Sequence, residues 1–360
     1  MGEKLVSAVK GGVRELFPAY FALVMATGIV SIASHLLGME LVAQVLFQIN
    51  KVAYVILWIL VLARLIFYRR QLLADLIDHA RGPGFFTVIA GTCVLGSQFV
   101  LLAGEHTTAL VLWGIGFALW HLLIYTFLTA ATVKETKPTL ETGINGAWLI
   151  AVVATQSISV LGTMLASGLP QWKETLLFYT LTMYLLGGML YILIMVLIFY
   201  RWLFFKLEPK QLTPPYWISM GAVAITTLAG DTLILNAGQW TFLGELLPFL
   251  KGFNIFFWAT ATWWIPLLVI LGVWRHIDKR YPLTYDPQYW GLVFPLGMYT
   301  TCTFQLAKAL ELPFLYAIPR VFVYIALAAW LATFAGLIWR LVSSLILVPL
   351  RSQRPQEGTG

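Results

Sequence analysis

Long apolar segments dominate the chain, and short polar connections separate them. Each segment is about 20 residues or longer, which is the length that an α-helix needs to cross the hydrocarbon core of a membrane. The pattern predicts ten membrane-spanning helices, at 17–37, 43–67, 84–104, 108–131, 145–167, 175–204, 215–236, 246–273, 288–309 and 316–348. We therefore expect an all-α polytopic membrane protein with one transmembrane domain over residues 1–348 and a disordered cytoplasmic tail at 349–360.

A seventeen-residue pattern opens every second apolar segment. Its copies begin at Pro18, Pro83, Gly146, Pro215 and Gln288, at intervals of 65, 63, 69 and 73 residues. Each interval accommodates one helix across the membrane, one helix back and two connections. The repeat predicts five helical hairpins in a pseudo-five-fold arrangement, and an axis through a membrane is a natural place for a central pore.

Small and hydroxyl residues recur on one face of this repeat. Positions 3, 7, 10 and 14 lie on the same side of a helix because their spacing follows the helical period. Such a face indicates either close helix packing or a narrow lumen whose hydroxyl groups solvate an ion, and the two are compatible. The predicted pore-lining residues are Thr27, Ser31, Thr92, Thr155, Ser159, Gly221, Gly297 and Thr301.

One position of this face differs in the last copy, where it carries a bulky aromatic residue. Phe294 stands at position 7, where the other copies have aliphatic residues or glycine, and Pro295 follows it. Proline removes a backbone hydrogen bond and kinks a helix. A phenylalanine that projects into a lumen at a kink would block it by excluding water, so we predict that Phe294 is a gate.

Composition and charge agree with a membrane protein. Hydrophobic residues make up 60% of the chain and charged residues 11%, against about 25% charged in a soluble domain. All but five of the 23 Lys and Arg residues fall on one predicted side, the exceptions being Lys51, Lys173, Lys251, Lys308 and Arg320. The positive-inside rule makes that side cytoplasmic, with both termini inside and the protein in the inner or plasma membrane. The basic balance follows from these connections, and no nucleic-acid partner is expected.

A few ionisable residues lie inside the predicted spans, where charge is costly and commonly functional. Asp231 would form an ion pair with Lys251, Lys308 or Arg320, or else serve as a proton site for acid-coupled transport. The two cysteines, Cys93 and Cys302, do not have metal-ligand spacing, and we expect no metal and no cofactor.

Two stretches of the chain resemble a known family. The segment YWGLVFPLGMYTT in the ninth span and the opening FPAYFALVMATGIVSIASHLLGM resemble bacterial tellurite-resistance and C4-dicarboxylate transporters, yeast malate permease and plant slow-type anion channels. The resemblance covers about residues 15–348. It implies a homotrimer in which each protomer has its own pore, lined by the five odd-numbered helices and occluded by a phenylalanine that corresponds to Phe294.

The expected function is therefore an anion-selective channel or facilitator for small anions. The alternative is a proton-coupled transporter of a C4-dicarboxylate such as malate, or of sulfite. Small anions or organic acids would be the permeants, and lipids would surround the protein. An intramembrane enzyme would need paired aspartates for a metal-diphosphate. The nearest case is Asp75 and Asp78, which we interpret as a solvated face beside Arg69, Arg70 and Arg81, so no enzyme is expected.

Overall fold

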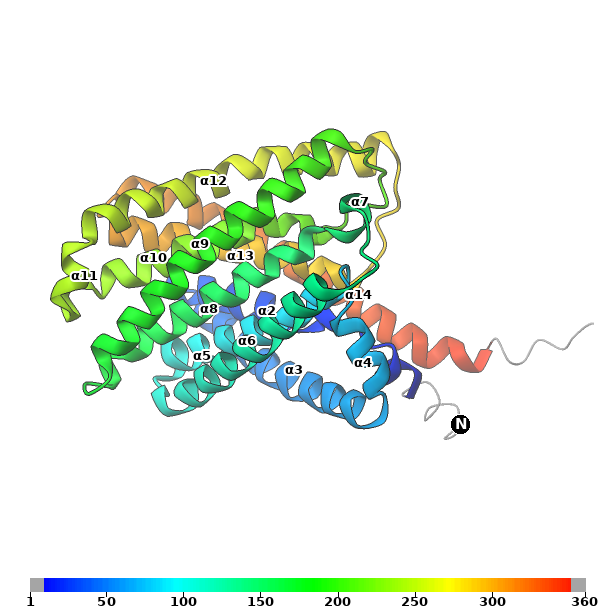
Figure 1. Cartoon of the computed structure of the whole chain (residues 1–360), viewed down its shortest axis with the longest axis horizontal. Helices are drawn as coiled ribbons and strands as arrows, with labels where there is room; N and C mark the ends of the chain where they lie inside the picture. The colour runs from blue at the N-terminus through cyan, green and yellow to red at the C-terminus, as the bar shows by residue number, and fades with distance from the viewer. Residues whose placement is uncertain (1–9, 351–360) are drawn as a thin grey trace, which may run out of the picture.

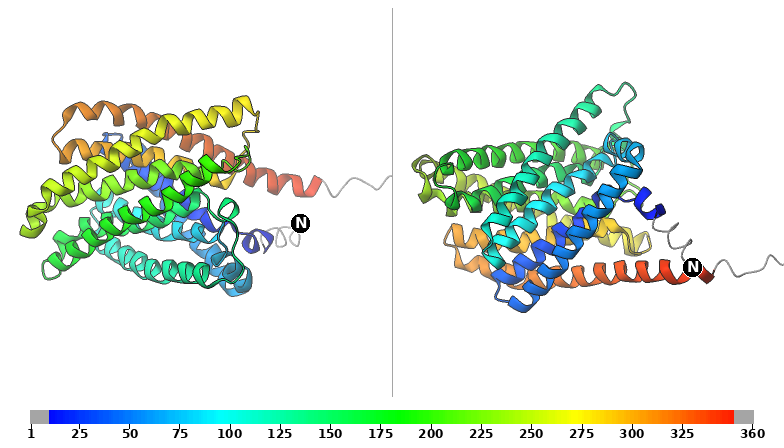
Figure 2. Two further views of the ribbon diagram at one scale, coloured as in Figure 1. Left: turned by 45° about the horizontal axis from the view of Figure 1, so that its top comes forward. Right: turned by 90° about the horizontal axis from the view of Figure 1, so that it is seen from below.

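The computed structural model describes residues 10–350, with the side chains of residues 10–343. Over this range the elements are helices of the α, 3-10 and π types, joined by short connections without strands. The predicted tail at 349–360 lies almost wholly outside the described residues. The long helices run side by side along the longest axis of the molecule (Figure 1; Figure 2).

Five helices form the buried centre, and each starts with a single 3-10 turn. The helices are α2 (Ala22–Leu36), α5 (Phe86–Gln98), α8 (Ile150–Leu165), α10 (Ile218–Leu235) and α13 (Trp290–Ala309). Their first turns are η1 (Pro18–Phe21), η2 (Gly82–Phe85), η4 (Gly146–Leu149), η6 (Pro214–Trp217) and η9 (Pro287–Tyr289). Four of the five turns carry proline near their start, where its missing N–H costs nothing and its fixed φ suits a helix. The turn η4 instead uses Asn145, whose side chain accepts a hydrogen bond from the Ala147 amide at 2.9 Å.

A long outer helix follows each of these five inner helices and packs against it. The outer helices are α3 (Glu40–Phe67), α6 (His106–Val133), α9 (Lys173–Phe204), α12 (Leu247–Val273) and α14 (Ala317–Leu350). The connecting elements are α4 (Arg69–Leu76), η3 (Phe99–Ala103), α7 (Leu140–Gly143), η5 (Ala166–Gly168), η7 (Ala237–Gln239), α11 (Thr241–Glu245), η8 (Trp274–Asp278) and η10 (Pro313–Tyr316). The outer helices expose large apolar side chains such as Ile59, Leu122 and Val196, as a surface in contact with lipid requires.

Nine helical segments within the described residues are long and apolar enough to cross a membrane. They coincide with nine of the ten predicted spans, and the chain is a multi-pass membrane protein. The exception is α13, whose second half carries the polar residues Thr300, Thr301, Thr303, Gln305 and Lys308. The ninth of the ten predicted spans therefore stays a prediction.

Contacts between the inner helices run in a closed cycle. Helix α2 contacts α5, α5 contacts α8, α8 contacts α10, α10 contacts α13, and α13 returns to α2. The five 3-10 turns contact one another in the same order. The two ends of the chain meet where the Trp330 indole N–H of α14 donates to the Thr27 hydroxyl of α2 at 2.9 Å.

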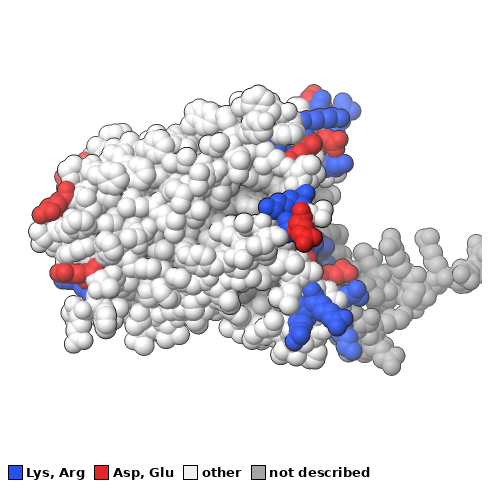
Figure 3. Space-filling model, viewed as in Figure 1, with Lys and Arg blue, Asp and Glu red and all other residues white. Residues whose placement is uncertain are grey.

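Charge is concentrated at the two ends of the molecule, and the middle of the face shown is free of it. Lys and Arg gather at the end on the right of Figure 3, near which the inner helices begin (Figure 1). We call this the basic end, and the opposite one the far end. The connections that follow α3 and α9 lie at this basic end, as does the start of η1 (Figure 1).

Candidate functional site

Two cavities lie one behind the other along the five inner helices. The basic-end cavity has a volume of about 430 Å³, and the far-end cavity about 240 Å³. Every inner helix contributes residues to both, and no residue lines both. On α13 the change from one cavity to the other takes a single helical turn, between Phe294 and Met298.

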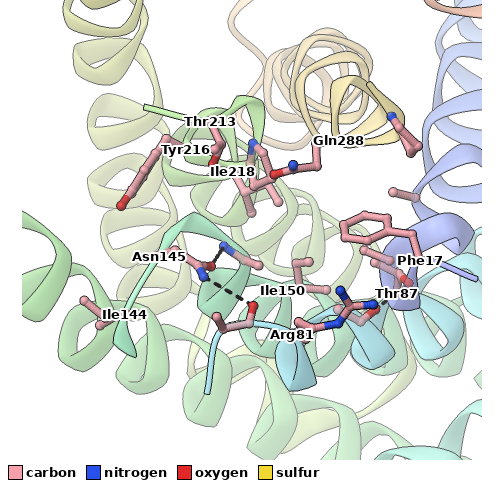
Figure 4. A pocket seen from close by; sticks show the side chains of 18 of the residues that line it. Phe17, Arg81, Thr87, Ile144, Asn145, Ile150, Thr213, Tyr216, Ile218 and Gln288 are labelled. Atoms are coloured by element: carbon pink, nitrogen blue, oxygen red, sulfur yellow. Dashed lines mark hydrogen bonds between the residues drawn. The ribbon is translucent and has the colours of Figure 1, made fainter. Parts of the chain in front are cut away.

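The basic-end cavity is surrounded by the starts of the inner helices. All five 3-10 turns, together with the connections before them, contribute to its lining. Figure 4 shows Phe17, Thr87, Ile150, Ile218 and Gln288 around one space, each from a different part of the chain. Because the N-terminus of a helix carries a partial positive charge, the convergence of five such ends favours an anion in this cavity.

Arg81 reaches the basic-end cavity from the connection between α4 and η2. Its Nε lies 2.8 Å from Asp75 Oδ1, and Asp75 Oδ2 lies 2.6 Å from Arg64 Nη2. Asp75 is therefore held between two guanidinium groups, whereas the sequence suggested a solvated face. Burial and the charge of Lys134 lower the pKa of the neighbouring His79, so its imidazole is neutral at neutral pH.

Arg201, in the last turn of α9, is the second cation that lines this cavity. The residue is 3% exposed. Its Nε donates to the backbone carbonyl of Glu141 at 2.9 Å. Its Nη1 is enclosed and has no hydrogen-bond partner among the described residues. Glu141 is the single acidic residue among those lining the cavity.

The far-end cavity has a different lining. Most of its residues are apolar, and hydroxyl groups are interspersed among them from Ser97, Ser157, Thr232 and Thr301. Its polar residues also include Asn236, Gln305 and Lys308. Lys308 is the single charged residue that lines it.

The predicted gate lies at the boundary between the cavities. Phe294 lines the basic-end cavity and is 1% exposed. Pro295 stands inside α13 directly after it. Two predicted pore glycines serve close helix contacts there. A Cβ at Gly221 would meet Pro295 Cγ at 2.7 Å, and one at Gly297 would meet Ile29 Cγ2 at 2.9 Å.

Three predicted pore threonines are turned toward outer helices. An aromatic side chain of an outer helix lies within hydrogen-bond distance of each hydroxyl. These pairs are Trp330 Nε1 with Thr27 at 2.9 Å, the Tyr54 hydroxyl with Thr92 at 3.1 Å, and Trp120 Nε1 with Thr155 at 2.9 Å. A buried indole N–H needs an acceptor, and the threonines supply it.

The two predicted pore serines also contact outer helices. Ser31 donates to the Ala43 carbonyl of α3, and Ser159 donates to the Thr180 carbonyl of α9, both at 2.7 Å. Neither serine is among the residues that line the cavities, whereas the eighth predicted residue, Thr301, lines the far-end cavity. The packing interpretation of the small-residue face thus describes both serines, and the lumen interpretation describes Thr301.

Of the two interpretations of Asp231, the ion pair does not agree with the structure, and the proton site stays a prediction. Asp231 is fully buried, and its Oδ1 accepts a hydrogen bond from Asn254 Nδ2 of α12 at 2.7 Å. Within the described part of the chain, no lysine or arginine lies within ion-pair distance of it. Lys251 and Arg320 are exposed on outer helices, and Lys308 is at the far-end cavity. A neutral amide therefore takes the place of the expected cation.

The residues of α2 that line the two cavities are not apparent from the sequence. Ala22 and Met25 line the basic-end cavity, and Ile29 and Ile32 line the far-end cavity. Their spacing is helical, but every residue from Ala22 to Ser34 is buried. In a helix that is buried on all sides, apolar residues give no periodic signal for the side that faces a cavity.

Comparison with known proteins identifies the family. The sequence model of the family described as voltage-dependent anion channel matches residues 15–338 of this chain. The chain belongs to this family. An uncharacterized membrane protein of Mycobacterium tuberculosis is 37% identical over 156 residues, which are 43% of this chain and 79% of that protein. An uncharacterized transporter of Methanocaldococcus jannaschii is 25% identical over 82% of this chain and 85% of its own length. A sulfite efflux pump of Arthroderma benhamiae is 24% identical over 91% of both chains.

Proposed function

We propose that this protein is an anion channel or facilitator, and that its path runs through the two cavities. The observation that carries the proposal is that both cavities are lined by the same five helices, in sequence along their length. A path of this kind allows an anion to exchange its hydration shell for hydroxyl groups and helix ends in several weak steps. Membership of the voltage-dependent anion channel family supports the same class of permeant.

The boundary between the cavities would be the closed gate. Phe294 lines the basic-end side and Met298 the far-end side, one turn apart on a helix that contains Pro295. An aromatic ring and a thioether exclude water from a narrow passage, and a dehydrated ion does not cross such a passage at an appreciable rate. Movement of the Phe294 ring would join the two cavities.

The topology that goes with this path has ten spans in five hairpins, with α13 as the ninth. The contact cycle of the inner helices supports a pseudo-five-fold arrangement. The basic end would face the cytoplasm, because cytoplasmic connections carry the excess of Lys and Arg. In that orientation the larger cavity, with its helix N-termini and two arginines, would collect anions from the cytoplasm.

The second candidate is a proton-coupled transporter of sulfite or a C4-dicarboxylate. The fungal relatives named as sulfite efflux pumps favour sulfite. Asp231 would be the proton site, since it is a carboxylate at membrane depth whose Oδ2 has no hydrogen-bond partner in the part of the chain that the structure describes. Its hydrogen bond to Asn254 orients it toward an outer helix, and it is absent from the lining of both cavities.

The experiment that separates the two candidates is current across a planar bilayer that contains the purified protein. A channel gives a reversal potential at the chloride equilibrium value, with little dependence on a pH gradient. A coupled transporter gives no such current, and instead shows acid-stimulated uptake of sulfite or malate into vesicles that Asp231→Asn abolishes. Absence of both activities in correctly folded protein would overturn the proposed function.

A further inference from the structure

Arg201 has hydrogen-bonding capacity that the described chain does not use. Its Nε donates to a backbone carbonyl, and no carboxylate within the described residues lies within ion-pair distance of the guanidinium. A buried charge without a partner is among the costliest arrangements in a folded protein. The enclosed Nη1 therefore calls for a ligand that the chain itself does not supply.

The surroundings of Arg201 suit an anion. It lines the 430 Å³ cavity into which the N-termini of the inner helices converge. The other cation of the cavity, Arg81, is already engaged by Asp75. Glu141 contributes its backbone oxygen to Arg201 Nε, so it orients the guanidinium without forming a salt bridge.

We propose that Arg201 is the recognition residue of an oxyanion-binding site in the basic-end cavity. The ligand class is a small oxyanion, because the planar guanidinium offers parallel N–H donors that match two oxygens of one anion. A halide has a single acceptor centre and uses this geometry less well. The inference rests on the proposed function and deepens it, because it names the class of anion that the path would select.

The test is thermal unfolding of the purified full-length protein with sulfite, nitrate or chloride at equal ionic strength. We expect both oxyanions to raise the unfolding temperature of the wild type more than chloride does. Arg201→Gln should weaken the apparent oxyanion affinity about tenfold or more, since hydrogen bonds to charged groups contribute about 1.5–3 kcal/mol. Arg201→Lys keeps the positive charge but loses the paired N–H donors of the guanidinium. This variant should therefore lose the preference for oxyanions over chloride.

Lys206→Gln is the matched control. It removes one positive charge from the connection that follows α9, but the Lys206 side chain is 84% exposed and is not among the residues that line the cavity. We expect this variant to bind oxyanions as the wild type does. Equal weakening by Lys206→Gln and Arg201→Gln would mean a diffuse field rather than a site, and would overturn the proposal.

A gain-of-binding variant covers the case in which Arg201→Gln does not fold. Glu141→Gln removes the single carboxylate of the lining and keeps the backbone oxygen that Arg201 contacts. Oxyanion affinity should rise about two- to fivefold, as expected for removal of a partly screened like charge. No oxyanion-dependent stabilisation in the wild type, or no change in Glu141→Gln, would overturn the site.

Binding and flux report separately on the site and on the proposed function. Arg201-dependent oxyanion binding in a protein without anion flux would keep the site and reject the channel. Anion flux with binding that does not depend on Arg201 would keep the channel and reject the site.

Discussion

The two cavities share five helices but offer an anion different surroundings. The basic-end cavity is larger, has arginines and a glutamate in its lining, and receives the first turns of all five inner helices. The far-end cavity is lined mostly by aliphatic side chains and isolated hydroxyls, with Lys308 as its charged residue. For the anion path that we propose, this difference would favour capture of the anion at the basic end and weak binding along the far end.

The largest effect should come from removing the boundary between the cavities. Phe294→Ala would join them, because the ring lies where the lining of α13 changes from one cavity to the other. We expect anion current in planar bilayers to rise about tenfold or more as the hydrophobic block is lost. Phe256→Ala, at a half-exposed phenylalanine of α12, is the control and should leave the current unchanged. An unchanged current in Phe294→Ala, with normal folding, would contradict the gate.

A larger residue should not be tolerated at Gly221, where α10 contacts α13 beside the boundary between the cavities. Gly221 lies between Ile218 of the basic-end cavity and Ile225 of the far-end cavity. A Cβ there would lie 3.2 Å from the Pro295 Cα, so Gly221→Ala should destabilise the fold by about 1–3 kcal/mol. Gly114→Ala in α6 has open space and should not destabilise it. Thermal unfolding measures both, and equal unfolding temperatures would show that the boundary is loosely packed.

Hydroxyl groups that line a cavity should affect current more than those that bind outer helices. Thr301→Val removes a far-end hydroxyl and should reduce anion current about two- to fivefold. Thr155→Val removes the acceptor of the Trp120 indole, and should cost about 1 kcal/mol of stability without a change in current. A loss of current in Thr155→Val alone would restore the lumen interpretation of the small-residue face.

The smallest effect should come from Lys308. The side chain is exposed, and a charge in contact with solvent is screened by salt. Lys308→Gln should lower conductance by about twofold or less at low ionic strength, and the difference should disappear at high salt. A large loss that persists at high salt would mean that the far end holds a tight anion site, and the contrast between the cavities would fail.

The spans were predictable because their cause is local. An apolar run of about 20 residues is sufficient to indicate a membrane helix, and nine segments match. Phe294 could be predicted as a gate because the sequence itself shows an aromatic residue followed by proline at one position of the repeat. The arrangement of the helices was harder to predict, since the contact of α2 with α13, which closes the cycle of inner helices, depends on tertiary packing.

Most of the cavity lining could not be predicted from the sequence. The lining residues of α2 are aliphatic, and they lie on a helix that is buried on all sides. Thr27 was predicted to line a pore, but its hydroxyl accepts a hydrogen bond from the Trp330 indole. In the sequence Arg201 is only one of the basic residues on the predicted cytoplasmic side, because its burial depends on contacts of the end of α9 with α7 and η6.

The hydrogen bond between Trp330 and Thr27 has a consequence for biogenesis. Its partners are 303 residues apart, so α2, which is synthesised early, is covered by α13 and α14 only after these last two long helices have been made. Loop-closure entropy rises only slowly with such a separation, so thermodynamics tolerates the delay. A chain that stops before α13 would lack both of these helices, and the Thr27 hydroxyl would not receive its indole N–H. The incompletely covered helix would then be the first inner one, although the missing residues are the last ones.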